Sequence, residues 1–391
     1  MTPGPRTPPA TSPMERLGSG DDLLEKNGHS QIQRAKPDRS GVPPLRMVAW
    51  EVTRSCNLNC VHCRAAAERG PYPGELSTEE SLRLIDGIAS FSTPVVILTG
   101  GEPLLREDIY DIARYGTSRG LRMVIAPNGT LIDAEKASRL QACGIQRASI
   151  SLDGATPESH DRFRRVEGAF EGALRGIGFF KQVGLEFQVN TTLTQRNASE
   201  LPAILELAVR LGAVAHHIFL LVPTGRGKEL GQEALGAEEY EKILHWFYDQ
   251  GEKVPLQLKA TCAPHYYRIL RQRAQEEGKR VTPQSHGLNA MTRGCLGGIG
   301  FCFISYKGDV QPCGYLEVFS GSVKEQSLKE IWETSAVFER LRNFSSYKGR
   351  CGRCEYIRVC GGCRARAFEA NGDFLSEEPL CAYQPGKKSL A

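Results

Sequence analysis

Three cysteines lie close together in one short stretch of the sequence, Cys56, Cys60 and Cys63, with the spacing Cys-x3-Cys-x2-Cys. They follow the apolar run that begins at Met47, so we expect a loop at the end of a strand. A cubane iron–sulfur cluster has four irons, and three thiolates leave one iron free to bind another molecule. An open position distinguishes a catalytic metal site from a closed structural one. The alternative is structural zinc, which usually takes a fourth protein ligand.

A second group of cysteines occupies the C-terminal part of the chain. Its eight members are Cys295, Cys302, Cys313, Cys351, Cys354, Cys360, Cys363 and Cys381. Eight thiolates are enough for two closed cubane clusters, although Cys-x2-Cys pairs are also typical of structural zinc. Cys302 lies in an apolar run and could be a buried small residue, which would leave one of the two clusters of this C-terminal group with three ligands and an open iron. Cys143 and Cys262 fit neither pattern, and we expect Cys143 to pack in a helix.

Alternating apolar and amphipathic stretches between Met47 and about Asp249 predict an α/β fold. The candidate strands are Met47–Thr53, Val95–Leu98, Arg122–Ala126, Ala148–Leu152, Glu186–Thr192 and His217–Val222. Candidate helices lie between them, and a capping box from Ser77 to Glu80 opens the first. Six strand–helix units predict a parallel sheet with right-handed crossovers, whose functional site lies at the carboxyl ends of the strands.

Composition limits the class of protein. The 391 residues allow one large domain and a smaller one, and 49 basic against 45 acidic residues give no case for a nucleic-acid partner. No apolar run reaches the roughly 18 residues that span a bilayer, and no signal peptide is recognisable. Thirteen cysteines without an export signal indicate metal ligands in a reducing cytoplasm. We expect residues 1–44 to be a disordered tail, 45–253 the main domain, 254–294 a linker or substrate-contact segment, and 295–385 the cysteine-rich domain.

The cysteine loop, together with the run from Thr99 to Pro103 (TGGEP), resembles the radical S-adenosylmethionine (SAM) family. The resemblance implies a (β/α)6 partial barrel of the TIM type, a 4Fe–4S cluster on the three cysteines of the loop, and SAM on the open iron. An electron donor such as ferredoxin or flavodoxin would supply the electron that cleaves SAM to methionine and a 5′-deoxyadenosyl radical, and the radical would then take a hydrogen atom from the substrate.

The same resemblance assigns residues to SAM. Gly100, Gly101 and Glu102 would bind its methionine amine, and Ser151 and Asp153 its ribose. Asn128 follows another strand end and is either a SAM contact or part of an ordinary Asn-Gly turn. Arg164 could pair with the SAM carboxylate, or belong to a solvated face with the neighbouring arginines.

The C-terminal cysteines resemble the SPASM extension of radical SAM enzymes, which carries auxiliary clusters. Gly308, five residues before Cys313, fits that pattern, whereas the two residues between Cys360 and Cys363 are one fewer than usual. The family's crossed ligation would place one cluster on Cys295, Cys302, Cys313 and Cys363. It would place the other on Cys351, Cys354, Cys360 and Cys381. Closed clusters favour a reaction in which the substrate is oxidised and an electron must leave.

Four stretches are similar to radical SAM enzymes of heme formation, namely residues 260–268, 294–298, 302–317 and 351–366. The third most resembles the heme synthases of the siroheme-dependent pathway, which act on iron-coproporphyrin III. The resemblance implies oxidative decarboxylation of two propionates to vinyl groups, giving heme b. The alternatives are another step of heme or heme d1 formation, or a peptide maturase of the same architecture. A non-catalytic electron-transfer protein is disfavoured by the open iron.

A porphyrin with four carboxylates needs cations and a wide apolar slot. His265, Tyr266 and Arg268 are candidate substrate contacts, and their neighbours Tyr267, Arg271 and Arg273 could join them. His265, His216 or His217 could approach the heme iron, because imidazole is a common axial ligand. The alternative is a helix with exposed arginines, and histidines that are satisfied by hydrogen bonds.

Overall fold

The computed structural model describes residues 1, 4 and 41–386. The predicted disordered tail therefore lies outside the described residues, apart from Met1, Gly4 and the short segment 41–44. That segment belongs to the folded part of the protein, because the Trp332 indole donates a hydrogen bond to the Pro43 carbonyl at 2.9 Å. Within the described residues, the chain just before residue 45 therefore packs against the domain that we expected to begin there.

One sheet of ten strands runs through the molecule in the order β10-β9-β8-β1-β2-β3-β4-β5-β6-β7. The parallel strands are β1 (Met47–Thr53), β2 (Val95–Gly100), β3 (Arg122–Ile125), β4 (Ala148–Ser151), β5 (Phe187–Leu193), β6 (Ala215–Leu220), β7 (Gln257–Thr261) and β8 (Phe301–Ile304). Two short antiparallel strands, β9 (Asp309–Gln311) and β10 (Gly321–Ser322), extend one edge. The parallel α/β fold is confirmed, and all six predicted strands are present within a few residues of their expected bounds.

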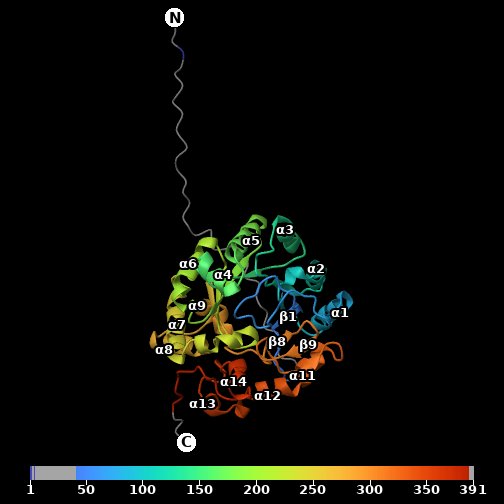
Figure 1. Ribbon diagram of the computed structural model, residues 1–391. Coiled ribbons are helices and arrows are strands. Elements are labelled where there is room, and N and C mark those ends of the chain that lie inside the picture. Colours follow the sequence, from blue (N-terminus) through green and yellow to red (C-terminus); the bar gives the residue numbers. More distant parts are fainter. Residues whose placement is uncertain (2–3, 5–40, 387–391) are drawn as a thin grey trace.

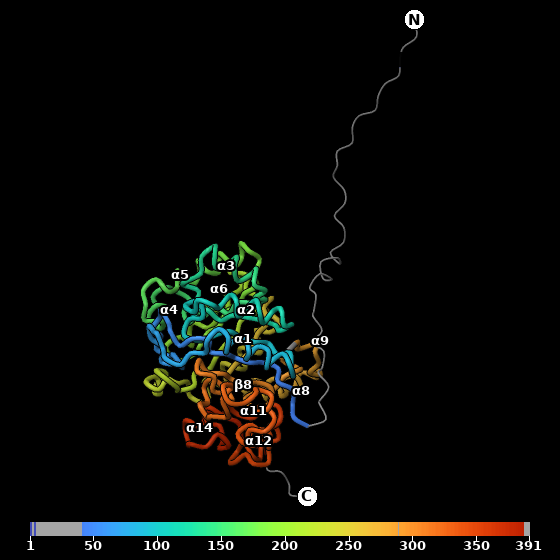
Figure 2. Tube along the Cα trace, turned by 90° about the vertical axis from the view of Figure 1, so that its right-hand side faces the viewer, coloured from blue at the N-terminus to red at the C-terminus, as the bar shows by residue number. Residues whose placement is uncertain are grey.

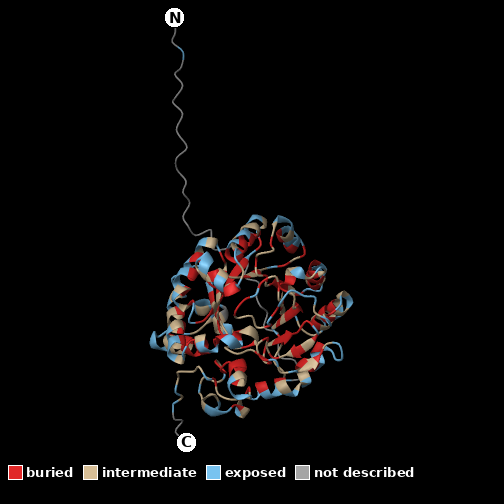
Figure 3. Ribbon diagram, viewed as in Figure 1, coloured by how far each residue is buried: buried red, intermediate tan, exposed pale blue. Residues whose placement is uncertain are grey.

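Helices follow the strands and cover the outer face of the sheet (Figure 1). They are α1 (Thr78–Ala89), α2 (Ile109–Ser118), α3 (Ala134–Ala142), α4 (Pro157–Arg164), α5 (Ala169–Val183), α6 (Leu201–Leu211), α7 (Ala237–Gln250) and α8 (His265–Glu276). The predicted capping box opens α1: the Glu80 backbone N–H donates to the Ser77 hydroxyl, and the Ser77 N–H donates to the Glu80 carboxylate at 2.8 Å. Buried residues gather on the strands and the inner helix faces, and exposed residues lie on the outer faces (Figure 3).

The cysteine-rich region joins the same sheet. Strand β8 pairs in parallel with β1, so that Val48 lies beside Cys302 and Trp50 beside Ile304. The short helices α9 (Pro283–His286), α10 (Leu288–Met291), α11 (Leu328–Thr334), α12 (Ala336–Arg342), α13 (Gly349–Gly352) and α14 (Arg364–Asn371) complete this part of the chain. Figures 1 and 2 both show α11, α12 and α14 gathered at one end of the barrel. Strand β7 lies in the segment that we expected to be a linker or substrate-contact segment.

Alternation along the strands leaves the barrel hollow. In β1, Val48 and Trp50 point into the core between sheet and helices, whereas Met47 and Ala49 line an interior cavity. Strands β4 to β7 also present polar side chains to this cavity. Among the described residues, no helix is long and apolar enough to cross a membrane.

Candidate active site

The interior cavity has a volume of about 1870 Å³. Two groups of cysteines line it, Cys56, Cys60 and Cys63 in one group and Cys262, Cys295, Cys313 and Cys363 in the other. A pocket for one drug-sized ligand usually measures about 300–1,000 Å³. The cavity therefore has room for SAM together with a second, larger molecule.

The three loop cysteines follow β1, and each of their sulfurs accepts one hydrogen bond. The donors are the Leu58 N–H to Cys56 at 3.4 Å, the Ala67 N–H to Cys63 at 3.3 Å, and the Arg164 guanidinium to Cys60 at 3.5 Å. Such donors stabilise thiolate charge, which is what an iron–sulfur cluster requires of its ligands. Burial raises the pKa of the metal-free Cys56 thiol to about 12. The cluster must therefore displace these protons when it binds.

A second loop, after β6, clamps the cysteine loop. The Arg226 side chain donates to the carbonyls of Cys60 and Ala67, each at 2.9 Å, and its backbone N–H donates to the Cys63 carbonyl at 3.0 Å. Gly225 has a φ of +53°, and a Cβ there would lie 2.2 Å from the Arg64 carbonyl. Sequence reasoning missed both residues, since they lie far along the chain from the cysteines.

Gly100 and Gly101 line the cavity at the end of β2. A Cβ on Gly100 would lie 2.3 Å from the Thr53 carbonyl oxygen, and one on Gly101 would lie 2.4 Å from the Ser55 carbonyl oxygen. The Gly101 N–H donates to Thr53 at 2.9 Å. The two glycines therefore let this turn lie directly against the start of the cysteine loop.

Glu102 differs from its predicted role, because its carboxylate is fully buried and does not line the cavity. It accepts hydrogen bonds from the backbone N–H groups of Leu104, at 3.1 Å, and Asn128, at 2.6 Å. Burial raises its pKa to about 7. The carboxylate joins the ends of β2 and β3 in this structure, and its predicted contact with the amine of SAM stays a prediction.

Asn128 lines the cavity and connects β3 to the cysteine loop. Its amide donates to Asn57 at 2.8 Å, and its side-chain oxygen accepts from the Thr130 N–H at 2.9 Å. It is thus more than an ordinary turn residue, since it positions the loop that carries Cys56.

Asp153 and Arg164 form an ion pair next to Cys60. Asp153 is buried, pairs with the Arg164 guanidinium, and accepts from the Thr192 N–H at 2.7 Å. Although burial opposes it, the charges of Arg164 and His62 keep the pKa of Asp153 below its ordinary value. Ser151 and Arg164 line the cavity, whereas Asp153 lies behind them. Asp153 therefore holds Arg164 in place, and its predicted contact with the ribose stays a prediction.

The second auxiliary set, Cys351, Cys354, Cys360 and Cys381, lies outside the cavity lining. Burial raises the pKa of Cys354, of Cys360 and of Cys381, the last to about 11. The charge of Cys351 raises all three further, which indicates that Cys351 lies near them. Cys351 accepts hydrogen bonds from Arg364 at 3.5 Å and from the Glu378 N–H at 3.4 Å. The ligation of one cluster by these four cysteines stays a prediction.

Among the described residues, no three Cys, His, Asp or Glu side chains converge as the ligands of a single metal ion would.

Cys302 does not join the cysteines of the cavity. It lies in the middle of β8, is fully buried, and faces the core beside Val48, while its neighbours Phe301 and Phe303 face the cavity. The pKa of its thiol is raised by burial alone, without any contribution from another cysteine. Strand alternation turns it away from the predicted cluster, so it behaves as the buried small residue of the alternative interpretation. Cys143 ends α3 and is also buried.

The predicted substrate contacts His265, Tyr266 and Arg268 are buried and do not line the cavity. They lie on the buried face of α8, where Arg268 pairs with Glu241 of α7 at 2.5 Å and its guanidinium lies 4.8 Å from the Tyr383 ring centroid. Tyr267, Lys259 and His217 do line the cavity. Tyr267 was among the residues expected to join the substrate contacts. Lys259 was not, and it lies on strand β7, which was not predicted.

Comparisons with known proteins agree with this geometry. The model of the Radical SAM superfamily matches residues 50–208, and the SPASM iron–sulfur cluster-binding domain matches residues 295–364. The chain is 54% identical to the AdoMet-dependent heme synthase of Oleidesulfovibrio alaskensis, over 97% of this chain and 96% of that protein. It is 56% identical to the AdoMet-dependent heme synthase of Nitratidesulfovibrio vulgaris, over 88% of this chain and 94% of that protein. The crystal structure of Streptococcus suis SuiB bound to its precursor peptide SuiA has a TM-score of 0.69 at 15% identity, over 87% of this chain and 76% of that one, which is a likeness of fold.

The chain therefore belongs to the radical SAM superfamily and carries a C-terminal SPASM domain. It is an enzyme, and its cofactors are 4Fe–4S clusters and SAM, as predicted. Within this superfamily, both relatives described above are AdoMet-dependent heme synthases.

Proposed function

We propose that the enzyme is a heme synthase, which converts two propionate side chains of iron-coproporphyrin III to vinyl groups and so forms heme b. The level of identity to two heme synthases supports this proposal. The observation that carries it is the charge of the cavity. Among the described residues, the lining contains seven arginines and two lysines but only one carboxylate, that of Glu333.

Several of these cations have no carboxylate partner in the described part of the chain. Lys259 and Arg122 form no ion pair there, and burial lowers the pKa of both. Lys259 lies beside His217 on the neighbouring strand. Burial, together with the charges of Lys259 and Arg147, holds the pKa of His217 well below its ordinary value. Partly buried cations without partners are costly, and an anionic ligand would relieve that cost. A substrate with several carboxylates would supply such anionic groups.

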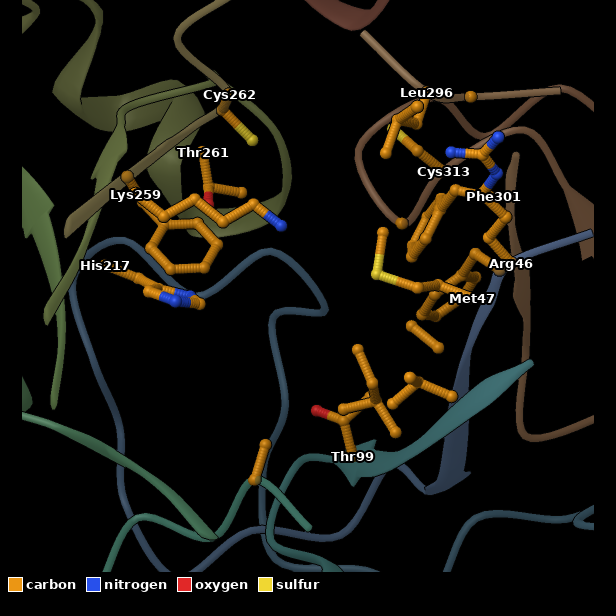
Figure 4. Close-up of a pocket in the computed structure, with 18 of the residues that line it drawn as sticks. Arg46, Met47, Thr99, His217, Lys259, Thr261, Cys262, Leu296, Phe301 and Cys313 are labelled. Carbon is orange, nitrogen blue, oxygen red and sulfur yellow. The ribbon is translucent and has the colours of Figure 1, made fainter. Parts of the chain in front are cut away.

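The opposite wall of the cavity is mostly apolar, with Arg46 as a cation among its apolar side chains (Figure 4). Met47, Phe301 and Leu296 face Lys259 and His217 across the open space (Figure 4). A porphyrin combines a wide apolar ring with charged propionates at its edge, so it would match both walls. Gly100, Gly101, Asn128, Ser151 and Arg164 line the cavity next to the cysteine loop, which supports our inference that they hold SAM.

The proposed reaction balances in atoms and electrons. When bound, the first cluster and SAM supply a hydrogen-atom abstractor, at the cost of one incoming electron and one SAM for each propionate. The β-carbon loses a hydrogen atom, the carboxylate leaves as carbon dioxide, and one electron leaves the substrate as the vinyl group forms. The auxiliary clusters would accept that electron. A ferredoxin or flavodoxin of the reducing cytoplasm would supply the incoming one.

An anaerobic assay with iron-coproporphyrin III, SAM and a strong reductant tests the proposal. We expect mass spectrometry to show the loss of one and then two carboxyl groups from the porphyrin, with 5′-deoxyadenosine formed in step. If 5′-deoxyadenosine forms while the porphyrin stays intact, the proposal fails, and another tetrapyrrole or a peptide becomes the substrate to test.

A further inference from the structure

Cys262 follows β7 and lines the cavity together with Cys295, Cys313 and Cys363. It lies ahead of the region that matches the SPASM model, which begins at Cys295. Figure 4 shows the Cys262 and Cys313 side chains extending towards each other from opposite walls of the cavity. These four cysteines thus come from four separate segments of the chain and face one space.

Backbone packing brings these segments together. A Cβ on Gly294 would lie 2.5 Å from the Pro264 Cβ and 2.5 Å from the Cys360 carbonyl oxygen, so the residue before Cys295 is held tightly between the other two segments. The Cys295 N–H donates to the Cys360 carbonyl at 3.1 Å. Segments 262–264, 294–295 and 360–363 therefore meet at a point where a larger residue than glycine would not fit.

Arg366 attaches Cys262 to the helix that follows Cys363. Its guanidinium donates to the Cys262 carbonyl at 2.7 Å and pairs with Glu378 at 2.9 Å. Glu378 in turn accepts from the Cys363 N–H at 2.6 Å. This buried network fixes the backbone of Cys262 relative to that of Cys363.

The backbone of Cys262 is left-handed, with a φ of +53°. A residue with a side chain is strained in this region, and such strained residues cluster at functional sites. The Tyr240 hydroxyl donates to the same carbonyl as Arg366, at 3.3 Å, and helps to hold this conformation. The strained backbone delivers the Cys262 thiol to the cavity.

We propose that Cys262, and not Cys302, is the fourth ligand of the auxiliary cluster held by Cys295, Cys313 and Cys363. The cluster is then closed by four thiolates and borders the substrate cavity, with its fourth ligand supplied by the barrel. The proposal rests on the cluster content of the enzyme and holds whatever the substrate is.

A pair of alanine variants of the full-length enzyme tests this assignment after anaerobic reconstitution with iron and sulfide. Iron content and the EPR spectrum of the reduced protein are measured with SAM present, so that the open iron of the first cluster is covered. Cys302→Ala should keep about twelve irons per chain and an unchanged spectrum, because three cubanes remain. Cys262→Ala should lose about four irons, or keep them with a spectrum that shifts when imidazole binds the newly open iron.

Formation of 5′-deoxyadenosine by Cys262→Ala shows that the barrel and the first cluster are intact. Cys262→Ser covers the case in which the alanine variant does not fold, since a serine oxygen can replace the sulfur as ligand. We expect it to keep its iron with an altered spectrum. Full iron and a wild-type spectrum insensitive to imidazole in the Cys262 variants, or iron loss in Cys302→Ala, would overturn the assignment.

Discussion

Arg164 reaches the sulfur of Cys60 because Asp153 holds its guanidinium from the other side. Removing one partner of a buried ion pair leaves an uncompensated charge, which typically costs about 3–5 kcal/mol. We expect Asp153→Asn to lower the free energy of unfolding by an amount of this order and to weaken retention of the first cluster. Anaerobic denaturation followed by circular dichroism, with iron release recorded in parallel, measures both effects.

The exposed pair of Glu206 and Arg210 provides a matched control, because its side chains are 69% and 61% exposed. Exposed pairs contribute about 0–1 kcal/mol, so Glu206→Gln should change neither quantity appreciably. Equal effects of the two substitutions would show that Asp153 does not support the cluster loop.

Lys259 provides a second test at the scale of a single residue. If its ammonium binds a substrate carboxylate, Lys259→Met should remove a charge-assisted hydrogen bond of about 1.5–3 kcal/mol. The KM for iron-coproporphyrin III should then rise by about 10- to 150-fold, while SAM cleavage without substrate is unchanged. Steady-state kinetics of vinyl formation and of 5′-deoxyadenosine formation separate the two.

Lys329 is the control for Lys259, because it also lines the cavity but already lies 4.0 Å from Glu333. Lys329→Met should leave the KM within about twofold of the wild-type value. An unchanged KM in Lys259→Met would remove Lys259 from the substrate site.

At the scale of elements, the turn after β2 and the cysteine loop after β1 form one unit. The Cβ of Gly101→Ala would lie 2.4 Å from the Ser55 carbonyl oxygen and 2.5 Å from that of Arg54, so the two loops must separate. We expect this variant to lose about four irons per chain and SAM cleavage, because the loop no longer presents its three thiolates together. Iron analysis after anaerobic reconstitution measures the loss.

Gly87 provides the opposite case within α1. A Cβ there meets nothing within 4 Å, so Gly87→Ala should keep its iron and gain about 0.5–1 kcal/mol in unfolding free energy through helix propensity. If Gly101→Ala reconstitutes as fully as Gly87→Ala, close contact between the loops is not required for the cluster.

At the scale of the whole molecule, buried histidines predict sensitivity to acid. Burial lowers the pKa of His62, His160 and His216 to about 4 and that of His265 to about 3. The unfolded chain, with histidine pKa values near 6.5, therefore binds more protons than the folded protein below that pH. Stability should fall as the pH drops from about 6.5 towards 4, by up to about 1.4 kcal/mol per pH unit for each histidine.

Replacing one histidine isolates this effect from acid damage to the clusters. His216→Gln should reduce the loss of unfolding free energy between about pH 7 and about pH 5.5, whereas His245→Gln should not, because the His245 side chain is 40% exposed. Denaturant titrations at the two pH values measure the difference. Identical slopes in both variants and the wild type would contradict the prediction.

Local signals predicted much of this fold. Apolar runs identified β1 to β6, and the Ser77 capping box identified the start of α1, because both depend on residues close together in sequence. Strand β7 was missed because Gln257, Lys259 and Thr261 put polar residues on its inner face, and the run then lacks the apolar continuity of a buried parallel strand. That polar face lines the cavity.

The sequence alone predicted the enzyme class. The three cysteines from Cys56 to Cys63 lie within one loop, so their spacing is visible in the sequence, and three thiolates leave one iron of a cubane cluster open. It also predicted that Gly100 and Gly101 let the backbone approach a ligand, and both residues line the cavity. Only the tertiary structure decided which way side chains face. Strand pairing turned Cys302 into the core, helix packing turned Arg268 towards Glu241, and the end of β7 brought Cys262 to the cysteines of a distant segment. Such orientations follow from contacts between residues far apart in sequence, which no local spacing encodes.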